Sequence, residues 1–205
     1  MITSLDQLDL SKQYTYADYL LWKFQERVEL LRGKLLPIAR PSEVHQLISS
    51  NLHYRLYGHL IGKQCRVYSA PFDVRLPLPA NRASATKIDT VIQPDICVVC
   101  DLTKLDEQGC VGAPELVVEI LSPGNSRREM DDKYELYQEA GVLEYWILSP
   151  QHQLAWAYHL DKDSNTFTVN RTKPYTVGDR LQSVLFPELA INLKDIFSEE
   201  NSQET

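Results

Sequence analysis

VIQPDICVV at residues 91–99 and ELVVEIL at residues 115–121 are two apolar, strand-like runs, and each contains an acidic residue. A strand of this composition normally excludes charge, because an unpaired buried carboxylate is costly or becomes protonated. Asp95 follows Pro94 in the first run, and Glu119 lies near the end of the second. Two such acids in neighbouring strands predict a shared function, and the simplest one is to bind a divalent cation.

The two runs lie within an alternation of helical and strand-like segments. In chain order the pattern predicts a helix from Thr15 to Phe24, a hairpin of residues 28–31 and 35–38 around Gly33, a helix from Pro41 to Gly62, strands at 66–68 and 72–76, a helix from Ser126 to Gly141, and strands at 144–149, 153–158 and 166–169. Residues 77–88 and the segment around Asp106–Gly109 read as loops. This order predicts an α/β fold with a mixed sheet flanked by helices.

The overall composition is that of a globular protein. A chain of 205 residues with 43% hydrophobic and 24% charged residues suits a single domain over residues 1–205, with a polar tail at 198–205. No apolar run reaches membrane-spanning length, and the N-terminus lacks the pattern of a secretory signal, so we expect a cytoplasmic protein. The net charge of −7 provides no global field for nucleic acid, although a local basic rim can serve an acidic protein.

The four cysteines predict free thiols rather than a disulfide framework, given the expected reducing compartment. Cys97 and Cys100 form a C-x-x-C pair in or just after a strand. Residues three apart on a strand point to opposite faces, which suits neither a zinc site nor a redox pair.

The acid pair is typical of a site for Mg²⁺ or Mn²⁺. These ions prefer hard oxygen ligands and are commonly held by one or two carboxylates, with water and substrate phosphate completing the shell. The alternative is structural: Asp95 caps a turn after proline, and Glu119 pairs with an arginine.

Several motifs around the acids resemble one known family. Pro94-Asp95, followed by Glu119-Ile120-Leu121, resembles the P-D…(D/E)-x-K signature of the restriction endonuclease-like superfamily. The further matching segments are VELLRGKL at 28–35, PSEVH at 41–45, EILSP at 119–123, DDKYELY at 131–137 and GVLEYWI at 141–147. Together they resemble the Uma-type family, a domain of unknown function abundant in cyanobacteria, over about residues 14–197. The resemblance implies a restriction endonuclease-like mixed central sheet, an N-terminal hairpin and additional C-terminal strands.

One position departs from the superfamily signature. Leu121 stands where the signature places a lysine. The resemblance implies that the lysine's role moves to the next helix, to Lys133, whose ammonium would then lie within roughly 3–6 Å of the two carboxylates. The alternative is a surface pair of Lys133 with Glu129 or Tyr137.

The remaining candidate site residues each have two interpretations. The resemblance implies that Glu29 is a further acid of the site, but it could instead pair with Arg32 or Lys34. His45 could bind a phosphate, brace a carboxylate, or be purely structural. Arg127 and Arg128 are either phosphate contacts or a solvated surface.

The motifs therefore predict a Mg²⁺- or Mn²⁺-dependent endonuclease acting on DNA, with Asp95 and Glu119 as metal ligands, Glu29 and Lys133 as further catalytic residues, and His45, Arg127 and Arg128 as substrate contacts. The alternative, suggested by the acidic balance and the missing lysine, is a nuclease-like binding module with little or no catalysis. A homodimer is a third expectation, with Trp146, Trp156 and Tyr158 as its aromatic face.

Overall fold

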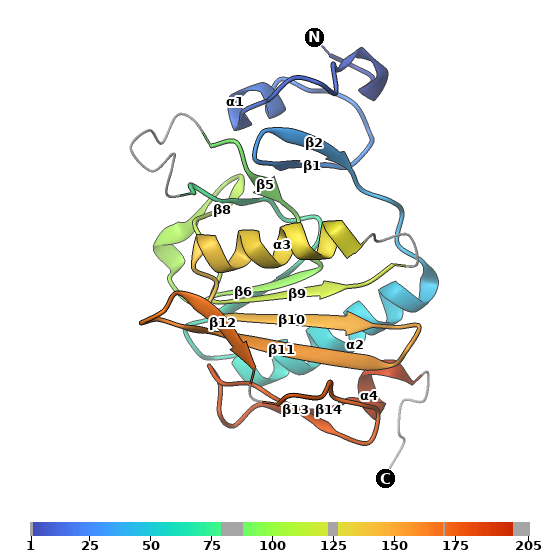
Figure 1. Cartoon of the computed structure of the whole chain (residues 1–205), viewed down its shortest axis with the longest axis vertical. Helices are drawn as coiled ribbons and strands as arrows, with labels where there is room; N and C mark the ends of the chain where they lie inside the picture. Colours follow the sequence, from blue (N-terminus) through green and yellow to red (C-terminus); the bar gives the residue numbers. More distant parts are fainter. Residues whose placement is uncertain (1, 79–87, 123–126, 170, 199–205) are drawn as a thin grey trace.

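Two six-stranded sheets and two long helices form the framework of the fold (Figure 1). This computed structural model describes residues 2–78, 88–122, 127–169 and 171–198, and it leaves the side chains of 127–129 undescribed. The helices are α1 (Tyr16–Tyr19), α2 (Glu43–Leu60), α3 (Arg127–Ala140) and α4 (Lys194–Phe197). The strands are β1 (Val28–Leu31), β2 (Lys34–Pro37), β3 (Arg66–Ser69), β4 (Val74–Arg75), β5 (Val91–Ile92), β6 (Ile96–Val99), β7 (Leu105–Asp106), β8 (Gly109–Val111), β9 (Leu116–Ile120), β10 (Glu144–Ser149), β11 (Leu154–Asp161), β12 (Thr166–Val169), β13 (Arg180–Gln182) and β14 (Ala190–Asn192).

The larger core is built on the sheet with strand order β12-β11-β10-β9-β6-β3. Strands β9 and β10 are parallel, with α3 as the connection between them, and the other neighbours pair antiparallel. Every residue of β9 and β10 is buried. A strand covered on both faces needs a continuous apolar run, which explains why these segments do not alternate between apolar and polar residues.

The two long helices cover opposite faces of this sheet (Figure 1). From α2, Ile48, Leu52 and Leu56 are buried against one face, while Leu136 and Tyr137 of α3 are buried against the other. The apolar spacing of the sequence also places Val44 in the stripe of α2, but Val44 is 47% exposed and does not belong to the buried face. The mixed sheet with flanking helices confirms the predicted fold class.

The second sheet has the order β2-β1-β5-β4-β8-β7 and carries the N-terminal hairpin. Strands β1 and β2 pair across the turn at Arg32 and Gly33, both of which have positive φ, and the glycine adopts this conformation without strain. A third cluster of buried residues, which includes Trp22 and Leu30, lies beneath this hairpin and the N-terminal segment.

Three local expectations were wrong. The run at 91–99 is not one strand: it divides at Gln93–Asp95 into β5 and β6, which belong to different sheets. The segment at 106–109 is the turn of the small hairpin β7–β8 rather than a plain loop. The first helix begins at the Thr15 capping box as predicted but ends at Tyr19, where the chain turns to bury Trp22.

Beyond these differences, the short elements β13, β14 and α4 had no clear signal in the sequence. The predicted loop at 77–88 and polar tail at 198–205 fall mostly outside the described residues. No described helix has the length and apolar character needed to cross a membrane.

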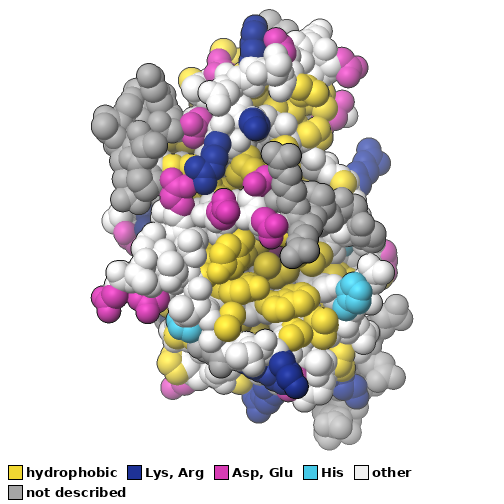
Figure 2. Space-filling view, viewed as in Figure 1, with side chains coloured by type: hydrophobic (Ala, Val, Ile, Leu, Met, Phe, Trp, Pro, Cys, Tyr) yellow, Lys and Arg dark blue, Asp and Glu magenta, His cyan; other side chains and the backbone are white. Residues whose placement is uncertain are grey.

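The aromatic C-terminal strands form core as well as surface. Trp146 is completely buried, so it cannot belong to the predicted dimer face. Trp156 and Tyr158 are partly buried beside α3. Figure 2 shows hydrophobic side chains gathered on this side of the molecule, below a row of acidic ones. The homodimer itself stays a prediction.

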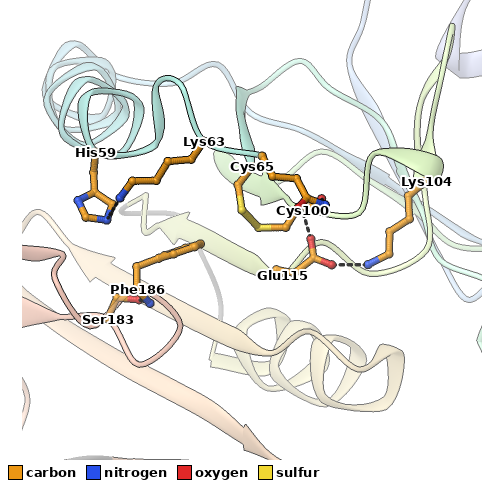
Figure 3. Close-up of a disulfide and its surroundings, with 9 residues drawn as sticks. His59, Lys63, Cys65, Cys100, Lys104, Glu115, Ser183 and Phe186 are labelled. Carbon is orange, nitrogen blue, oxygen red and sulfur yellow. Dashed lines mark hydrogen bonds and ion pairs between the residues drawn. A yellow bond between two sulfur atoms is a disulfide. The ribbon is translucent and has the colours of Figure 1, made fainter.

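A disulfide joins Cys65 to Cys100 (Figure 3), which contradicts the expectation of four free thiols. Strands β3 and β6 pair antiparallel with Arg66 opposite Val99, so the two cysteines lie opposite each other at the end of the ladder. A sequence separation of 35 residues gives no sign of this pairing. Cys97 and Cys110 are buried free thiols, and Cys97 points to the opposite face from Cys100 as predicted.

The Cys65→Ser/Cys100→Ser variant should lose about 3–4 kcal/mol of unfolding free energy, because the bond closes a loop of 35 residues in the unfolded chain. Urea unfolding with and without reductant measures the loss. Reductant should destabilise the wild type and leave the double variant unchanged. Titration of four reactive thiols in the unfolded, non-reduced protein would contradict this prediction.

Candidate active site

The strand register brings the two acids together. Strands β6 and β9 pair antiparallel with Ile96 opposite Val118, and extending this register by one residue puts Asp95 opposite Glu119. Pro94 interrupts the preceding run, and Asp95 lies in the bend where the chain passes from one sheet to the other. The two carboxylates therefore come together at the end of a buried sheet, which provides a fixed backbone frame for a site.

Asp95 is held from two sides. Its Oδ2 accepts a hydrogen bond from the Ile120 amide at 2.7 Å, and its Oδ1 lies 3.2 Å from Nε2 of His45. Ser42 caps α2 by accepting from the His45 amide, so His45 occupies the first turn of the helix. The imidazole thus braces the carboxylate, one of the alternatives that the sequence left open.

Glu119 shares one carboxylate oxygen between two partners from α3. Lys133 Nζ lies 3.0 Å from Glu119 Oε1, within the expected range of distance. The hydroxyl of Tyr137, one helical turn further on, donates a hydrogen bond to the same oxygen. Lys133 and Tyr137 are four residues apart and so lie on one face of the helix. Lys133 points into the site, and its alternative as a surface partner of Glu129 or Tyr137 does not describe this geometry.

Glu29 completes the group from the other sheet. Its Oε2 lies 3.3 Å from Lys133 Nζ, and its Oε1 accepts from the Gln93 amide at 2.8 Å. It therefore pairs with neither Arg32 nor Lys34, and Arg32 instead contacts Glu139 at 2.6 Å. The Lys133 ammonium bridges acids from β1 and β9, so it joins the two sheets at the site.

Burial and charge shift the proton affinities of these groups. Burial raises the pKa of Glu119 to about 7; Lys133 opposes this shift, while the Asp95 and Glu29 carboxylates add to it. For Lys133, burial disfavours the charge, but the two glutamates outweigh it and hold its pKa above the ordinary value. Burial also lowers the pKa of His45, yet the hydrogen bond and charge of Asp95 produce a net rise. The carboxylates of the site therefore favour the protonated, positively charged forms of Lys133 and His45.

The acids lie in a cleft of about 720 Å³. Glu29, Asp95, Glu119 and Lys133 line it together with His45 and residues of the exposed side of α2. The three acids and the lysine therefore line one cleft together with the exposed side of α2.

The donor set suits Mg²⁺ or Mn²⁺. No group of three or more histidine, cysteine and acidic side chains in the described ranges is arranged to hold a metal. Two carboxylates with open positions for water and phosphate are instead what these hard ions use. The rise in the pKa of Glu119 also fits, because a cation there would stabilise the ionised carboxylate.

The predicted site residues and those found in the structure differ in two respects. The side chains of Arg127 and Arg128, predicted as phosphate contacts, lie outside the described residues. Tyr137 and Gln93 were not predicted as site residues, although Tyr137 belongs to the DDKYELY segment and lies four residues after Lys133. The Gln93 contact is made by a backbone amide, for which the sequence contains no signal.

Comparisons with known proteins place the chain in a family and match its fold. Residues 16–194 match the Uma2 family model, described as "Putative restriction endonuclease". Two uncharacterized proteins of Synechocystis sp. are each 26% identical to the chain, one over 80% of it and 82% of the relative, the other over 69% and 77%. The fold is similar to a crystal structure from Anabaena variabilis described as a "putative nuclease belonging to DUF820", with TM-score 0.67, 19% identity and coverage of 90% of this chain and 97% of that one.

Proposed function

We propose, from the premise that the chain belongs to the Uma2 family of restriction endonuclease-like proteins, that it is a metal-dependent endonuclease that hydrolyses phosphodiester bonds in DNA. The observation that carries the proposal is the 3.0 Å contact of Lys133 Nζ with Glu119, in a cleft that also contains Asp95 and Glu29. Lys133 reaches the acids from helix α3. The leucine at position 121, where the superfamily signature has a lysine, therefore does not argue against catalysis.

Each residue of the candidate site has a definite role in this proposal. Asp95 and Glu119 would hold Mg²⁺ or Mn²⁺, and the bound ion would supply charge neutralisation and activation of water. Lys133 stays protonated beside its two acids and can donate hydrogen bonds to the attacking water or to the scissile phosphate. Glu29 and Tyr137 fix the position of the ammonium and of Glu119, while His45 orients Asp95.

Asp95→Asn should lower the affinity for Mg²⁺ and Mn²⁺ by at least about tenfold, since one anionic ligand is lost, and should abolish DNA cleavage. The asparagine retains an oxygen for the Ile120 amide, so the fold should be preserved. Calorimetric metal titration measures the first effect, and cleavage assays on plasmid and on single-stranded circular DNA measure the second.

Asp163→Asn, at an exposed position in the turn between β11 and β12, is the control and should behave as wild type. Equal metal binding and cleavage by wild type and Asp95→Asn would contradict the assignment. Metal binding by a wild type that cleaves no nucleic acid would instead favour a nuclease-like binding module.

A further inference from the structure

One wall of the cleft is a continuous strip of helix α2. The opposite side of the helix, with Ile48, Leu52 and Leu56, is buried against the sheet. The cleft side repeats at helical spacing and consists of Gln46, Ser49, Ser50, His53, Tyr54 and Tyr57. This wall begins at His45, beside the acids, and extends away from them along the helix.

The far part of this wall presents exposed aromatic rings. Tyr54 is 71% exposed and Tyr57 is 51% exposed, although both line the cleft. The Tyr57 ring is stacked on His53, with centroids 6.2 Å apart and an angle of 14° between the planes. His53 is in turn fixed by a 2.6 Å hydrogen bond between Nδ1 and Ser69 Oγ. The Tyr57 ring is thus held nearly parallel to an anchored imidazole, while the Tyr54 ring, with the Arg55 guanidinium 5.9 Å from its centroid, remains largely exposed.

Positive charge is scarce along the same cleft. Among the described residues that line it, only Arg27 and Lys133 are cationic. Arg27 donates two hydrogen bonds to Gln93 Oε1, at 2.9 and 2.7 Å, and Lys133 is engaged by Glu119 and Glu29. Duplex DNA is held mainly through phosphate contacts, and its stacked base pairs do not expose their faces to side chains. Unpaired bases can stack on aromatic rings whatever their sequence.

We propose that the cleft accommodates single-stranded DNA, or an unpaired stretch of it, with bases stacked on Tyr54 and Tyr57 and the backbone extending to the site at Asp95, Glu119 and Lys133. This inference rests on the proposed nuclease function and specifies its substrate class. Tyr54 and Tyr57 follow His45 by nine and twelve residues, which corresponds to about 13 and 18 Å of helix. At about 3.4 Å per stacked nucleotide, four to five nucleotides would separate the rings from the reacting phosphate.

Fluorescence anisotropy in EDTA tests the inference without cleavage. Wild type should bind a labelled single-stranded oligonucleotide at least about tenfold more tightly than the duplex of the same sequence. Tyr54→Ala and Tyr57→Ala should each weaken single-strand binding by about five- to 150-fold, since one stacked base contributes about 1–3 kcal/mol. Tyr54→Phe and Tyr57→Phe keep the ring and should retain the affinity. The salt dependence should be shallow, with a log–log slope no steeper than about −1.4 for two phosphate contacts.

Val44→Ala is the matched control, because Val44 is an exposed apolar residue of the same helix that does not line the cleft. Equal affinity for single strand and duplex, or alanine variants that bind as wild type, would overturn the inference. If wild type instead cleaves linear duplex DNA as fast as single-stranded DNA with Mg²⁺, the nuclease function stands and only the substrate class is wrong. A wild type that binds neither form of DNA and cleaves none overturns both.

Discussion

Lys133→Met should reduce DNA cleavage by about 10²–10³-fold while metal binding persists. This is the loss caused by removing one preorganised donor from a developing anion. The ammonium lies 3.0 Å from Glu119 and 3.3 Å from Glu29, and methionine retains the length of the stem without the charge. Asp95 and Glu119 both remain, so the ligands for the cation are retained. Single-turnover cleavage rates, together with calorimetric titration of Mg²⁺, measure the two properties separately.

Lys104→Met is the matched control for this experiment. Lys104 is likewise partly buried and pairs with a carboxylate, Glu115, at 2.6 Å (Figure 3). It does not line the cleft. Its variant should cleave at the wild-type rate, even if removal of the pair lowers stability. Thermal unfolding of both variants identifies any loss that arises from misfolding. A Lys133→Met protein that is folded and cleaves normally would show that the lysine is structural.

Glu144→Ala should destabilise the protein by about 3–5 kcal/mol. This is the range expected when a buried carboxylate is removed and the donors that it accepted from are left without an acceptor. Glu144 is completely buried at the start of β10. Its carboxylate accepts from Trp146 Nε1 at 2.8 Å, from Ser183 Oγ at 2.7 Å and from the amides of Val184 and Leu185. It therefore attaches the segment after β13 to the central sheet, and its loss leaves several buried donors unsatisfied.

Urea unfolding measures the effect of Glu144→Ala, with Glu188→Ala as the control. Glu188 is exposed in the same C-terminal region and should change stability by no more than about 0.5 kcal/mol. Because Glu144 does not line the cleft, the folded fraction of the variant should retain metal binding. A loss below about 1 kcal/mol would mean that water or a rearranged side chain replaces the carboxylate.

Local patterns were sufficient for most of the larger elements. The capping residue Ser42 and the apolar spacing through Leu60 defined α2, and the turn at Gly33 defined the β1–β2 hairpin. The apolar runs defined β9 and β10, because strands covered on both faces cannot carry polar residues at alternate positions. These signals lie within a few residues of one another, so no tertiary information is needed to read them. The short strands β13 and β14 escaped prediction because three residues contain too little periodicity.

The sequence by itself determined the mixed α/β architecture and singled out the two acids, because each is marked by a residue type that breaks or completes a local pattern. Lys133 became the candidate for the missing lysine only through the resemblance to the Uma-type family. Only the tertiary structure decided how these residues meet. The register of β6 on β9 sets Asp95 opposite Glu119, and the crossing of α3 brings Lys133 between Glu119 and Glu29. The disulfide and the aromatic wall of the cleft were likewise invisible in the chain. Such contacts join residues tens of positions apart, and their distances depend on the packing of the whole core rather than on any local preference.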